Sequence, residues 1–321
     1  MIAKIDNKKF YSENIQKKNI PIFFQPWWLD IVAPNSWDIL ISTSKNNDII
    51  AVMPFVFDKQ NKLIMPNFTP FLGPIFWHTS EKYASIISDE INIHIEFIEQ
   101  FNDFKSFEQK WHYSIKNWLP WYWNKYNQTT KYTYVLNNIS NHELIWEGFR
   151  DNIRREIRKA EKIVTIESNN DFELFFETLN KTFIRQGLNI ANKKTVLNNI
   201  FNECNKRDCG KSFFAKDKDN NIHAVILVIW DTNSAYYLIG GGDEKLRTSG
   251  ATSLLMWEAI KYSSKHVNTF DFEGSMIQPI ERFFRAFGAE QKPYFEITKT
   301  NSKTLFIKQE IKRIFNYIIK K

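Results

Sequence analysis

The sequence contains little cysteine and little histidine, and this scarcity excludes several kinds of site. Of its 321 residues only two are cysteines, Cys204 and Cys209, and only six are histidines. The spacing of the cysteines fits no common zinc or redox motif, a disulfide framework needs more of them, and no two histidines stand four residues apart. We therefore expect no metal site and no permanently bound cofactor.

Long apolar runs are also absent. No stretch reaches the ~18 apolar residues that a membrane-spanning helix needs, and Met1-Ile2-Ala3-Lys4 begins no apolar run of signal-peptide length. We expect no transmembrane segment and a cytoplasmic location. Contact with the inner face of a membrane stays open.

Aromatic residues, in contrast, are abundant, and the chain is basic. There are 28 Phe, 12 Tyr and 11 Trp, together 16% of the residues, and the formal net charge is +7. An aromatic-packed core explains the rings. The alternative is a surface that stacks on rings or sugars, with the Trp-rich segment 111–126 as its candidate. The charge favours phosphorylated or nucleic-acid partners without choosing among them.

The expected elements change in order along the chain. In the first half we expect strands at 38–42, 49–57, 91–97 and 131–136, then a basic helix at 147–162. In the second half we expect helices at 171–185 and 193–206 and an antiparallel meander of strands at 211–215, 222–230 and 235–240. After the meander come a helix at 249–264, a strand at 269–272, a helix at 279–287 and a strand at 294–298.

The two halves are also related to each other in sequence. The segment Ala51-Val52-Met53-Pro54-Phe55-Val56-Phe57-Asp58 aligns without a gap with Ala224-Val225-Ile226-Leu227-Val228-Ile229-Trp230-Asp231. Such a match fits two unrelated buried strands or an internal duplication of a fold. We expect an N-terminal domain at 1–145, a basic connecting helix at 146–165 and a C-terminal domain at 166–321.

A glycine-rich loop follows the third strand of the meander. Gly240-Gly241-Gly242 lead to Arg247-Thr248-Ser249-Gly250-Ala251-Thr252 and then to a helix. Glycines let a ligand approach the backbone, and the free N–H groups at a helix N-terminus favour anions. A helix cap at Ser249 or Thr252 is the alternative. The Gly-Lys-Ser/Thr ending of a nucleotide P-loop is absent. If the loop holds a pyrophosphate, we expect Gly250 to be exposed.

The basic helix at 147–162 allows two interpretations. Ile153, Ile157 and Ala160 form one apolar stripe, and most of the other positions are charged. The charges then either form a solvated face or hold a phosphate through Arg154, Arg155 and Arg158, since a guanidinium group suits a phosphate well.

Charged residues also gather around the strand at 269–272. Phe270 and Phe272 are expected in the core, which places Asp271 and Glu273 on the opposite face. In the following helix Glu281 and Arg285 are spaced to form an ion pair. These residues are either a structural charge cluster or a site in which Glu273 or Asp271 is a general base. Tyr236 or Tyr237 would protonate a leaving group there, or would simply pack.

Several of these motifs, in this order, resemble the FemABX-like, GNAT-type acyltransferases. The motifs are Asn152 to Ala160, the strand Tyr236 to Gly240, the Arg247 to Thr252 loop, Phe270-Asp271-Phe272-Glu273-Gly274-Ser275 and Arg282-Phe283-Phe284-Arg285-Ala286-Phe287-Gly288. The resemblance implies an α/β (α+β) chain of two tandem GNAT-like domains. Each would be a mixed, mainly antiparallel sheet flanked by helices, and the C-terminal domain would carry the acyl-donor site.

The resemblance also implies an activity, the transfer of an acyl group from an acyl-CoA co-substrate to an amine. The catalytic residues would be Glu273 and Asp271. The acyl donor would contact Leu238, Ile239, Arg247, Ser249, Gly250, Ala251 and Thr252. A small-molecule or lipid-linked amine acceptor would contact Tyr237, Arg154, Arg155, Arg282 and Arg285.

Two alternatives to this activity stay open. In the peptidoglycan branch of the family the donor is an aminoacyl-tRNA and the acceptor is a cell-wall precursor. That branch carries a catalytic Lys where this chain has Phe284, which argues against a tRNA partner. The other alternative is a non-catalytic binding protein of the same fold, with the segment 111–126 as a platform for a sugar or a lipid headgroup.

Overall fold

The computed structural model describes residues 7–78 and 80–302, so that the Met1-Ile2-Ala3-Lys4 stretch lies outside the described residues. Its contacts divide the chain into two compact units. Unit 1 comprises Met1–Lys18, Phe23–Lys131 and Pro293–Lys321, and unit 2 comprises Asn19–Ile22 and Tyr132–Lys292. We expected domain boundaries at 145/146 and 165/166, whereas the two units divide inside two strands. The basic helix, which we expected between the domains, belongs to unit 2.

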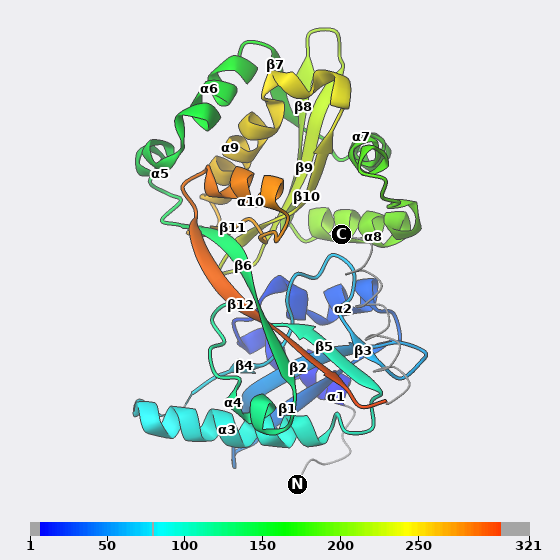
Figure 1. Ribbon diagram of the computed structural model, residues 1–321, viewed down its shortest axis with the longest axis vertical. Coiled ribbons are helices and arrows are strands. Elements are labelled where there is room, and N and C mark those ends of the chain that lie inside the picture. The colour runs from blue at the N-terminus through cyan, green and yellow to red at the C-terminus, as the bar shows by residue number, and fades with distance from the viewer. Residues whose placement is uncertain (1–6, 79, 303–321) are drawn as a thin grey trace, which may run out of the picture. The chain divides into compact units, whose positions relative to one another are not determined.

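Unit 1 is built from three short helices, one long helix and an antiparallel sheet (Figure 1). Its helices are α1 (Asn7–Asn14), α2 (Pro26–Val32), α3 (Tyr83–Glu99) and α4 (Leu119–Trp123). The strands β1 (Trp37–Thr43), β2 (Ile49–Phe57) and β3 (Leu63–Ile64) pair in that order, and β4 (Ile75–Phe76) also pairs with β2. A second set of strands has the order β5 (Ser106–Lys110), β12 (Glu290–Thr300) and β6 (Asn127–Asn137), and the last two continue into unit 2.

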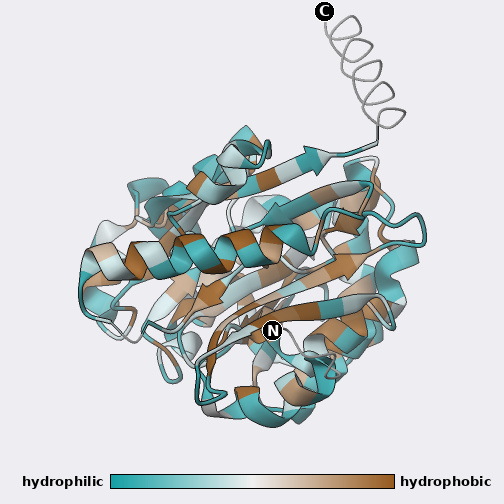
Figure 2. Ribbon diagram, turned by 90° about the horizontal axis from the view of Figure 1, so that it is seen from below, coloured by the Kyte–Doolittle hydropathy of each residue, from teal (hydrophilic) through white to brown (hydrophobic). Residues whose placement is uncertain are grey.

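The expected strand at 91–97 is wrong, because these residues lie inside α3. The sequence there alternates apolar and polar residues, which is typical of a strand. The helix instead buries Ile93, His94, Phe97 and Ile98, which share one face at spacings of one, four and five residues. Helices of the structure carry hydrophilic and hydrophobic residues in turn, whereas several strands are hydrophobic over much of their length (Figure 2).

The core of unit 1 is strongly aromatic. Trp111 and Trp121 are fully buried and their rings pack edge to face with centroids 5.2 Å apart, while Phe101 and Phe107 lie in the same cluster. Half of the Trp-rich segment's tryptophans are therefore core residues. Trp123 is 50% exposed, so a surface role in this segment would fall to the short helix α4 alone.

Unit 2 contains one mixed sheet in the strand order β6-β11-β10-β9-β8-β7 (Figure 1). The strands are β7 (Val164–Ser168), β8 (Gly210–Asp217), β9 (Ile222–Trp230), β10 (Ala235–Gly242) and β11 (Thr269–Asp271). Neighbouring strands from β7 to β10 are antiparallel, which confirms the meander, and only β10 and β11 are parallel. The mixed, mainly antiparallel sheet that we expected is confirmed.

The helices of unit 2 flank this sheet. They are α5 (His142–Gly148), α6 (Asp151–Ala160), α7 (Phe172–Arg185), α8 (Lys194–Lys206), α9 (Ala251–Ser263) and α10 (Gln278–Arg285), with a 3-10 helix η4 (Glu244–Ser249) before α9. The apolar stripe of the basic helix is confirmed, since Ile153, Ile157 and Ala160 are buried in the core of the unit. The chain bends at Phe149, whose extended backbone separates α5 from α6.

Candidate active site

The strand β10 is irregular at the residues expected to bind the acyl donor. Tyr237 pairs with Val228 and Ile239 with Leu227, so Leu238 is an extra residue that bulges from the ladder. On its other side β10 pairs with β11 only through Ala235 and Tyr236. The backbone of Leu238 and Ile239 therefore lies beyond the point at which pairing with β11 stops.

The chain leaves β11 through a tight turn held against β6. Glu273 and Gly274 have φ angles of 57° and 61°, in the left-handed region. A side chain at Gly274 is excluded, because an added Cβ would lie 2.1 Å from the carbonyl oxygen of Tyr132. The preceding Phe272 donates its N–H to the Tyr134 carbonyl at 2.9 Å. The sharp exit that we expected at Gly274 is therefore present.

Asp271 lies under this turn and has hydrogen-bond partners. Its Oδ1 accepts from the Thr133 hydroxyl and, at 2.8 Å, from the backbone N–H of Glu273. The side chain is buried, and this burial raises the pKa of Asp271 to about 6, against the effect of the two hydrogen bonds. Both contacts are made to Oδ1, and the bond from the Glu273 N–H holds the turn that carries Glu273.

Glu273 differs from Asp271 in lacking a partner. Its Oε1 is buried without a hydrogen bond, and it is the only carboxylate oxygen in that state among the residues that the structure describes. Burial raises the pKa of Glu273 well above its usual value, and the nearby charge of Asp271 raises it further. A buried carboxylate without a cation or hydrogen-bond donor is unfavourable, so this atom favours a proton or a bound cation.

Tyr237 lies beside Glu273. Burial raises the pKa of the Tyr237 phenol, and the charge of Glu273 raises it further, so the phenol keeps its proton at neutral pH. Its oxygen extends over Gly240, where an added Cβ would lie only 2.5 Å away. Its ring packs against Phe284 with centroids 5.9 Å apart. The phenol of Tyr237 on β10 thus lies within electrostatic range of the Glu273 carboxyl group that follows β11.

Phe284 occupies the position of the family's catalytic Lys, and it is buried. Its ring contacts Tyr237 and also Phe272, whose centroid is 5.2 Å away. The next residue, Arg285, is exposed and forms the expected ion pair with Glu281 at 2.7 Å. At the position where the resemblance places a Lys, Tyr237 is therefore in contact with an uncharged aromatic ring.

Two neighbouring residues of α10, Glu281 and the predicted acceptor residue Arg282, differ in their contacts. Glu281 accepts a hydrogen bond from the Tyr134 hydroxyl at 2.6 Å, and hydrogen bonds from Arg285 and Tyr134 lower the pKa of Glu281. Arg282 is exposed, with no hydrogen bond or ion pair from its side chain among the described residues. Of the two predicted arginines here, Arg285 is engaged within the protein and Arg282 is free to meet a ligand.

The predicted acyl-donor loop is largely built from internal contacts. Gly250 has a φ of 80° and is buried, and an added Cβ would lie 2.5 Å from the Glu156 carbonyl oxygen of α6. The expectation that Gly250 is exposed is therefore wrong, because α6 packs against the loop. Ser249 and Ala251 are buried as well, and the Ser249 hydroxyl accepts from the Ala251 N–H at 3.3 Å.

Three residues of the loop do reach solvent, Arg247, Thr248 and Thr252. Lys159 of α6 donates to the Thr248 carbonyl at 2.5 Å, and the Ser253 hydroxyl donates to Glu156, also at 2.5 Å. These bonds join α6 to the start of α9. An anion at this helix N-terminus would meet Arg247 and Thr252 first.

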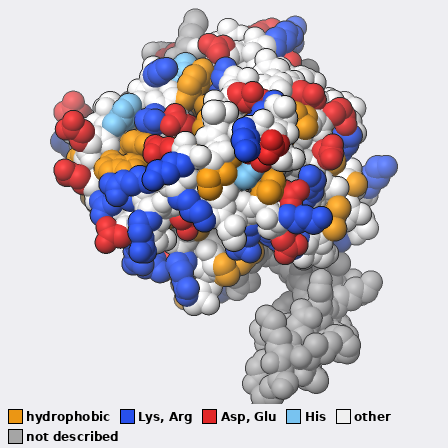
Figure 3. All heavy atoms as spheres, turned by 90° about the horizontal axis from the view of Figure 1, so that it is seen from above, with side chains coloured by type: hydrophobic (Ala, Val, Ile, Leu, Met, Phe, Trp, Pro, Cys, Tyr) orange, Lys and Arg blue, Asp and Glu red, His pale blue; other side chains and the backbone are white. Residues whose placement is uncertain are grey.

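The three arginines of α6 do not act alike. Arg154 pairs with Asp151 at 2.5 Å and donates to the Trp146 and Glu147 carbonyls at the end of α5. Arg158 lies over the Trp146 ring at 5.7 Å. Arg155 alone is exposed without a side-chain partner in the described part of the chain. Figure 3 shows Lys and Arg side chains gathered on the left of the viewed face, over α6.

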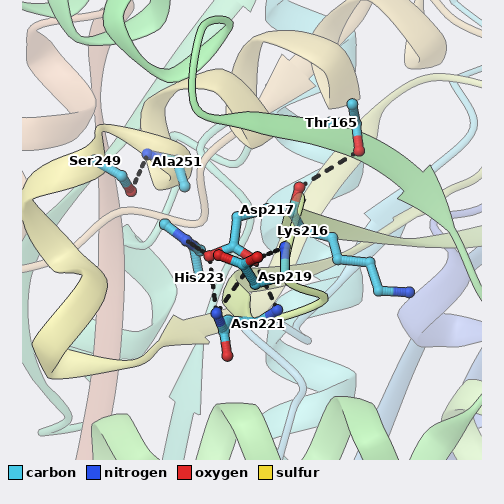
Figure 4. A network of polar contacts seen from close by, with 8 residues as sticks. All are labelled: Thr165, Lys216, Asp217, Asp219, Asn221, His223, Ser249 and Ala251. Atoms are coloured by element: carbon cyan, nitrogen blue, oxygen red, sulfur yellow. Dashed lines mark hydrogen bonds and ion pairs between the residues drawn. The ribbon is translucent and has the colours of Figure 1, made fainter.

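A polar network in the β8–β9 turn fixes the far end of the loop (Figure 4). Asp217 accepts from the N–H groups of Asp219 and Asn221, both at 2.9 Å, and contacts His223 Nε2 at 3.2 Å. The hydrogen bonds from Asn221 and its neighbours lower the pKa of Asp217. His223 in turn accepts the Asp243 N–H at 3.0 Å through its carbonyl oxygen. The turn therefore holds Asp243, the residue that directly precedes η4.

Three residues of the site were not predicted from the sequence. Thr133 and Tyr134 come from β6 and hold Asp271, Phe272 and Glu281. Thr182 of α7 exchanges hydrogen bonds of 2.8 and 3.0 Å with the backbone of Gly242. No local pattern marks them, since each acts on a segment far away in the sequence.

Two kinds of feature are absent from residues 7–78 and 80–302. No three His, Cys, Asp or Glu side chains lie together as ligands for a metal ion. No helix in the same residues is both long and apolar enough to cross a membrane.

The comparison with known proteins concerns the family and the fold. Residues 147–285 match the family model described as "Acetyltransferase (GNAT) domain". No curated protein matches the chain. The structure is similar to that of FemX, with a TM-score of 0.65 and 12% identity over 90% of this chain and 95% of that chain.

Two more solved structures also cover most of the chain. L-PGS from Bacillus licheniformis has a TM-score of 0.55 and 9% identity over 98% of both chains. A tandem GNAT protein from the clavulanic acid biosynthesis pathway has a TM-score of 0.54 and 10% identity, over 86% of this chain and 87% of that one. At these identities the likeness concerns the fold.

The chain therefore carries a GNAT acyltransferase domain over residues 147–285. Its fold as a whole is that of FemABX-like and tandem GNAT proteins. The expected family resemblance, fold class and acyltransferase class are confirmed.

Proposed function

We propose that the protein is an N-acyltransferase that moves an acyl group from an acyl-CoA-type thioester to the nitrogen of an amine. The observation that carries this proposal is the buried, unpaired Oε1 of Glu273 beside Tyr237. An acceptor ammonium group would supply the hydrogen bond and the positive charge that this oxygen lacks. The raised pKa of Glu273 brings its basicity closer to that of an amine, as general-base catalysis requires.

The reaction would follow from these groups. Glu273 takes a proton from the ammonium group, and the free amine attacks the thioester carbonyl carbon. The backbone N–H of Leu238 or Ile239, at the bulge of β10, donates to the resulting oxyanion. The intermediate then expels a thiolate, which the Tyr237 phenol protonates. The surplus proton on the amide nitrogen restores the phenol, and Glu273 releases its proton to solvent. The products are an amide and a free thiol, while Asp271 keeps the Glu273 turn in place.

The acyl donor would lie along the other end of β10. Its pyrophosphate would meet the N-terminus of α9, where Arg247 and Thr252 are exposed. Arg155 would add a positive charge from α6. The buried residues Ser249, Gly250 and Ala251 would shape the loop and would contribute backbone rather than side-chain contacts.

The test is a binding and turnover assay with several acyl-CoAs and small amines. Glu273→Gln should keep the affinity for the acyl donor and lose ~10²-fold or more of kcat, the usual scale for a general base. Glu258→Gln, on the exposed side of α9 and paired with Lys261, is the matched control and should keep full activity. Unchanged turnover of Glu273→Gln, or a folded parent protein that binds no acyl-CoA, would contradict the proposal.

A second candidate uses an aminoacyl-tRNA as donor and a lipid-linked or cell-wall amine as acceptor. It is supported by the cations over α6 (Figure 3), by the net charge of +7 and by the similarity to FemX and to L-PGS. The aromatic ring of Phe284 at the Lys position speaks against it. Binding of tRNA that weakens steeply with salt, together with aminoacyl transfer, would favour this donor over acyl-CoA.

The same assay addresses a non-catalytic role. A parent protein that binds a ligand without turnover, and whose affinity survives Glu273→Ala and Asp271→Ala, would be a binding protein of this fold.

A further inference from the structure

The helix α8 ends in a well-defined backbone motif. Asp208, two residues beyond the last helical residue Lys206, has a φ of 50°. Its N–H donates to the Asn205 carbonyl at 3.3 Å, and the N–H of Cys209 donates to the Cys204 carbonyl at 3.0 Å. This pair of bonds around a left-handed residue is the Schellman motif, which closes many helices.

The Schellman motif brings two particular side chains together. The residue that donates the longer-range bond and the residue that accepts it commonly contact each other through their side chains. In α8 these residues are Cys209 and Cys204, the only cysteines of the chain, and both are free thiols. The next residue, Gly210, passes directly over Cys204, since an added Cβ would lie 2.7 Å from the Cys204 Cβ.

The two thiols are inequivalent. Cys204 is fully buried, whereas Cys209 is half-buried. A hydrogen bond between the two sulfurs lowers the pKa of Cys209 and raises the pKa of Cys204, and the neighbouring Arg207 charge lowers that of Cys209 further. Cys209 is therefore the more accessible and the more readily ionised of the two thiols, and Cys204 is the thiol beneath it.

We propose that Cys204 and Cys209 form a redox modification site, at which a peroxide converts the two thiols into an intramolecular disulfide. The spacing of five residues matches no common redox motif in sequence, but it matches the contact pair of this helix end. The site is separate from Glu273 and does not depend on the proposed transfer reaction.

The chemistry is balanced with hydrogen peroxide as oxidant. The Cys209 thiolate attacks one peroxide oxygen, so that an S–O bond forms, the O–O bond breaks and hydroxide leaves. Cys204 then loses its proton and attacks the Cys209 sulfur, which forms the S–S bond and breaks the S–O bond, and water leaves. In sum, two thiols and one hydrogen peroxide give one disulfide and two waters.

The first experiment treats the full chain with hydrogen peroxide and measures free thiols, intact mass and non-reducing electrophoresis. We expect the loss of both thiols, a mass lower by two hydrogen atoms, a monomeric band and full reversal by dithiothreitol. Cys204→Ser should instead gain oxygen at Cys209 or dimerise, and Cys209→Ser, which keeps only the buried Cys204, should react much more slowly. Oxygen added separately to both cysteines of the parent chain, or disulfides found only between chains, would overturn the proposal.

The second experiment tests the geometry with a matched pair of variants. Asp208→Gly and Asp208→Val both remove the charge, but only glycine accepts a positive φ freely. Disulfide formation should keep its rate or accelerate in Asp208→Gly and should slow several-fold in Asp208→Val, with melting temperatures showing that both are folded. Equal rates in the two folded variants would show that the helix end does not bring the thiols together.

Discussion

Two regions of unit 2 combine glycine with polar residues, and they differ in one respect. In the loop before α9, Asp243 accepts from the Lys245 N–H at 2.9 Å and Ser249 from the Ala251 N–H at 3.3 Å. In the turn after β11, Glu273 has a buried oxygen with no partner at all. The comparison shows that polar density alone does not mark a site. An unsatisfied buried group is the better indicator of a place for a ligand.

The glycines of the two regions do not distinguish them. Gly250 and Gly274 both have positive φ, and both pass close to a backbone carbonyl. Each is required by a tight packing contact, whether or not a ligand is bound. The predictions below therefore separate structural from functional roles in the two regions.

The largest effect is expected for Gly250→Val. A branched side chain at a φ of 80°, with Cβ 2.5 Å from the Glu156 carbonyl oxygen, must displace α6 or the loop. We expect a loss of about 3–5 kcal/mol in the free energy of unfolding, measured by urea denaturation. Gly148→Ala is the control, since an added Cβ there meets no atom within 4 Å, and it should change stability by less than ~1 kcal/mol. If Gly250→Val left the free energy of unfolding unchanged, the loop would have room for a side chain, as an open ligand-binding loop does.

Glu273→Gln should lower activity while raising stability. The folded-state pKa of Glu273 is raised, so the native state holds this proton more tightly than the unfolded chain, and its stabilisation is lost as pH rises. At pH 8 the neutral amide removes that penalty, and the variant should melt at a higher temperature than the parent. Below the unfolded pKa near 4.5 the difference should vanish. A variant that loses activity and stability together would make Glu273 a structural residue.

The raised pKa of Asp271 predicts the pH range over which the free energy of unfolding changes. Its pKa rises from 3.8 to about 6 on folding, so its stabilisation is complete below pH 3.8 and is lost as pH rises through about 6. The loss corresponds to about 3 kcal/mol. Asp271→Asn keeps an oxygen for Thr133 and the Glu273 N–H, and it should remove this slope from the free energy of unfolding. An unaltered slope in the variant would assign the pH dependence to other groups.

The smallest effects should separate two neighbouring arginines. Arg154→Ala loses the bonds to Asp151 and to the end of α5 and should lower stability by about 1 kcal/mol, with unchanged affinity for the acyl donor. Arg155→Ala should leave the melting temperature unchanged and weaken donor binding several-fold, less so at high salt. If the two variants behaved alike in both measurements, α6 would be a uniformly solvated helix.

The strands of the meander and the helices α7 to α9 were predictable because they combine clear periodicity with turn residues. The segment 91–97 was not, because its alternation was accidental and the helix α3 buries adjacent residues. Glu273 and Tyr237 were predicted as site residues from their positions in the sequence, and their roles stay predictions. Their environment was not, since it depends on Phe284 and on the β6 residues Thr133 and Tyr134, which are distant in sequence. The burial of Gly250 likewise required the packing of α6.

The bulge at Leu238 has a consequence for which side chains share a face of the sheet. In a regular strand Tyr237 and Gly240, three residues apart, point to opposite faces. The single inserted residue reverses this parity, and the Tyr237 phenol consequently lies across Gly240, 2.5 Å from where a Cβ would stand. The Tyr237 phenol thus packs directly against the backbone of Gly240. A methyl group introduced there would clash with the phenol and also with Ile226 Cγ2 at 2.8 Å and the Val225 carbonyl oxygen at 2.9 Å, so the position of Tyr237 is tied to the packing of β10 against β9.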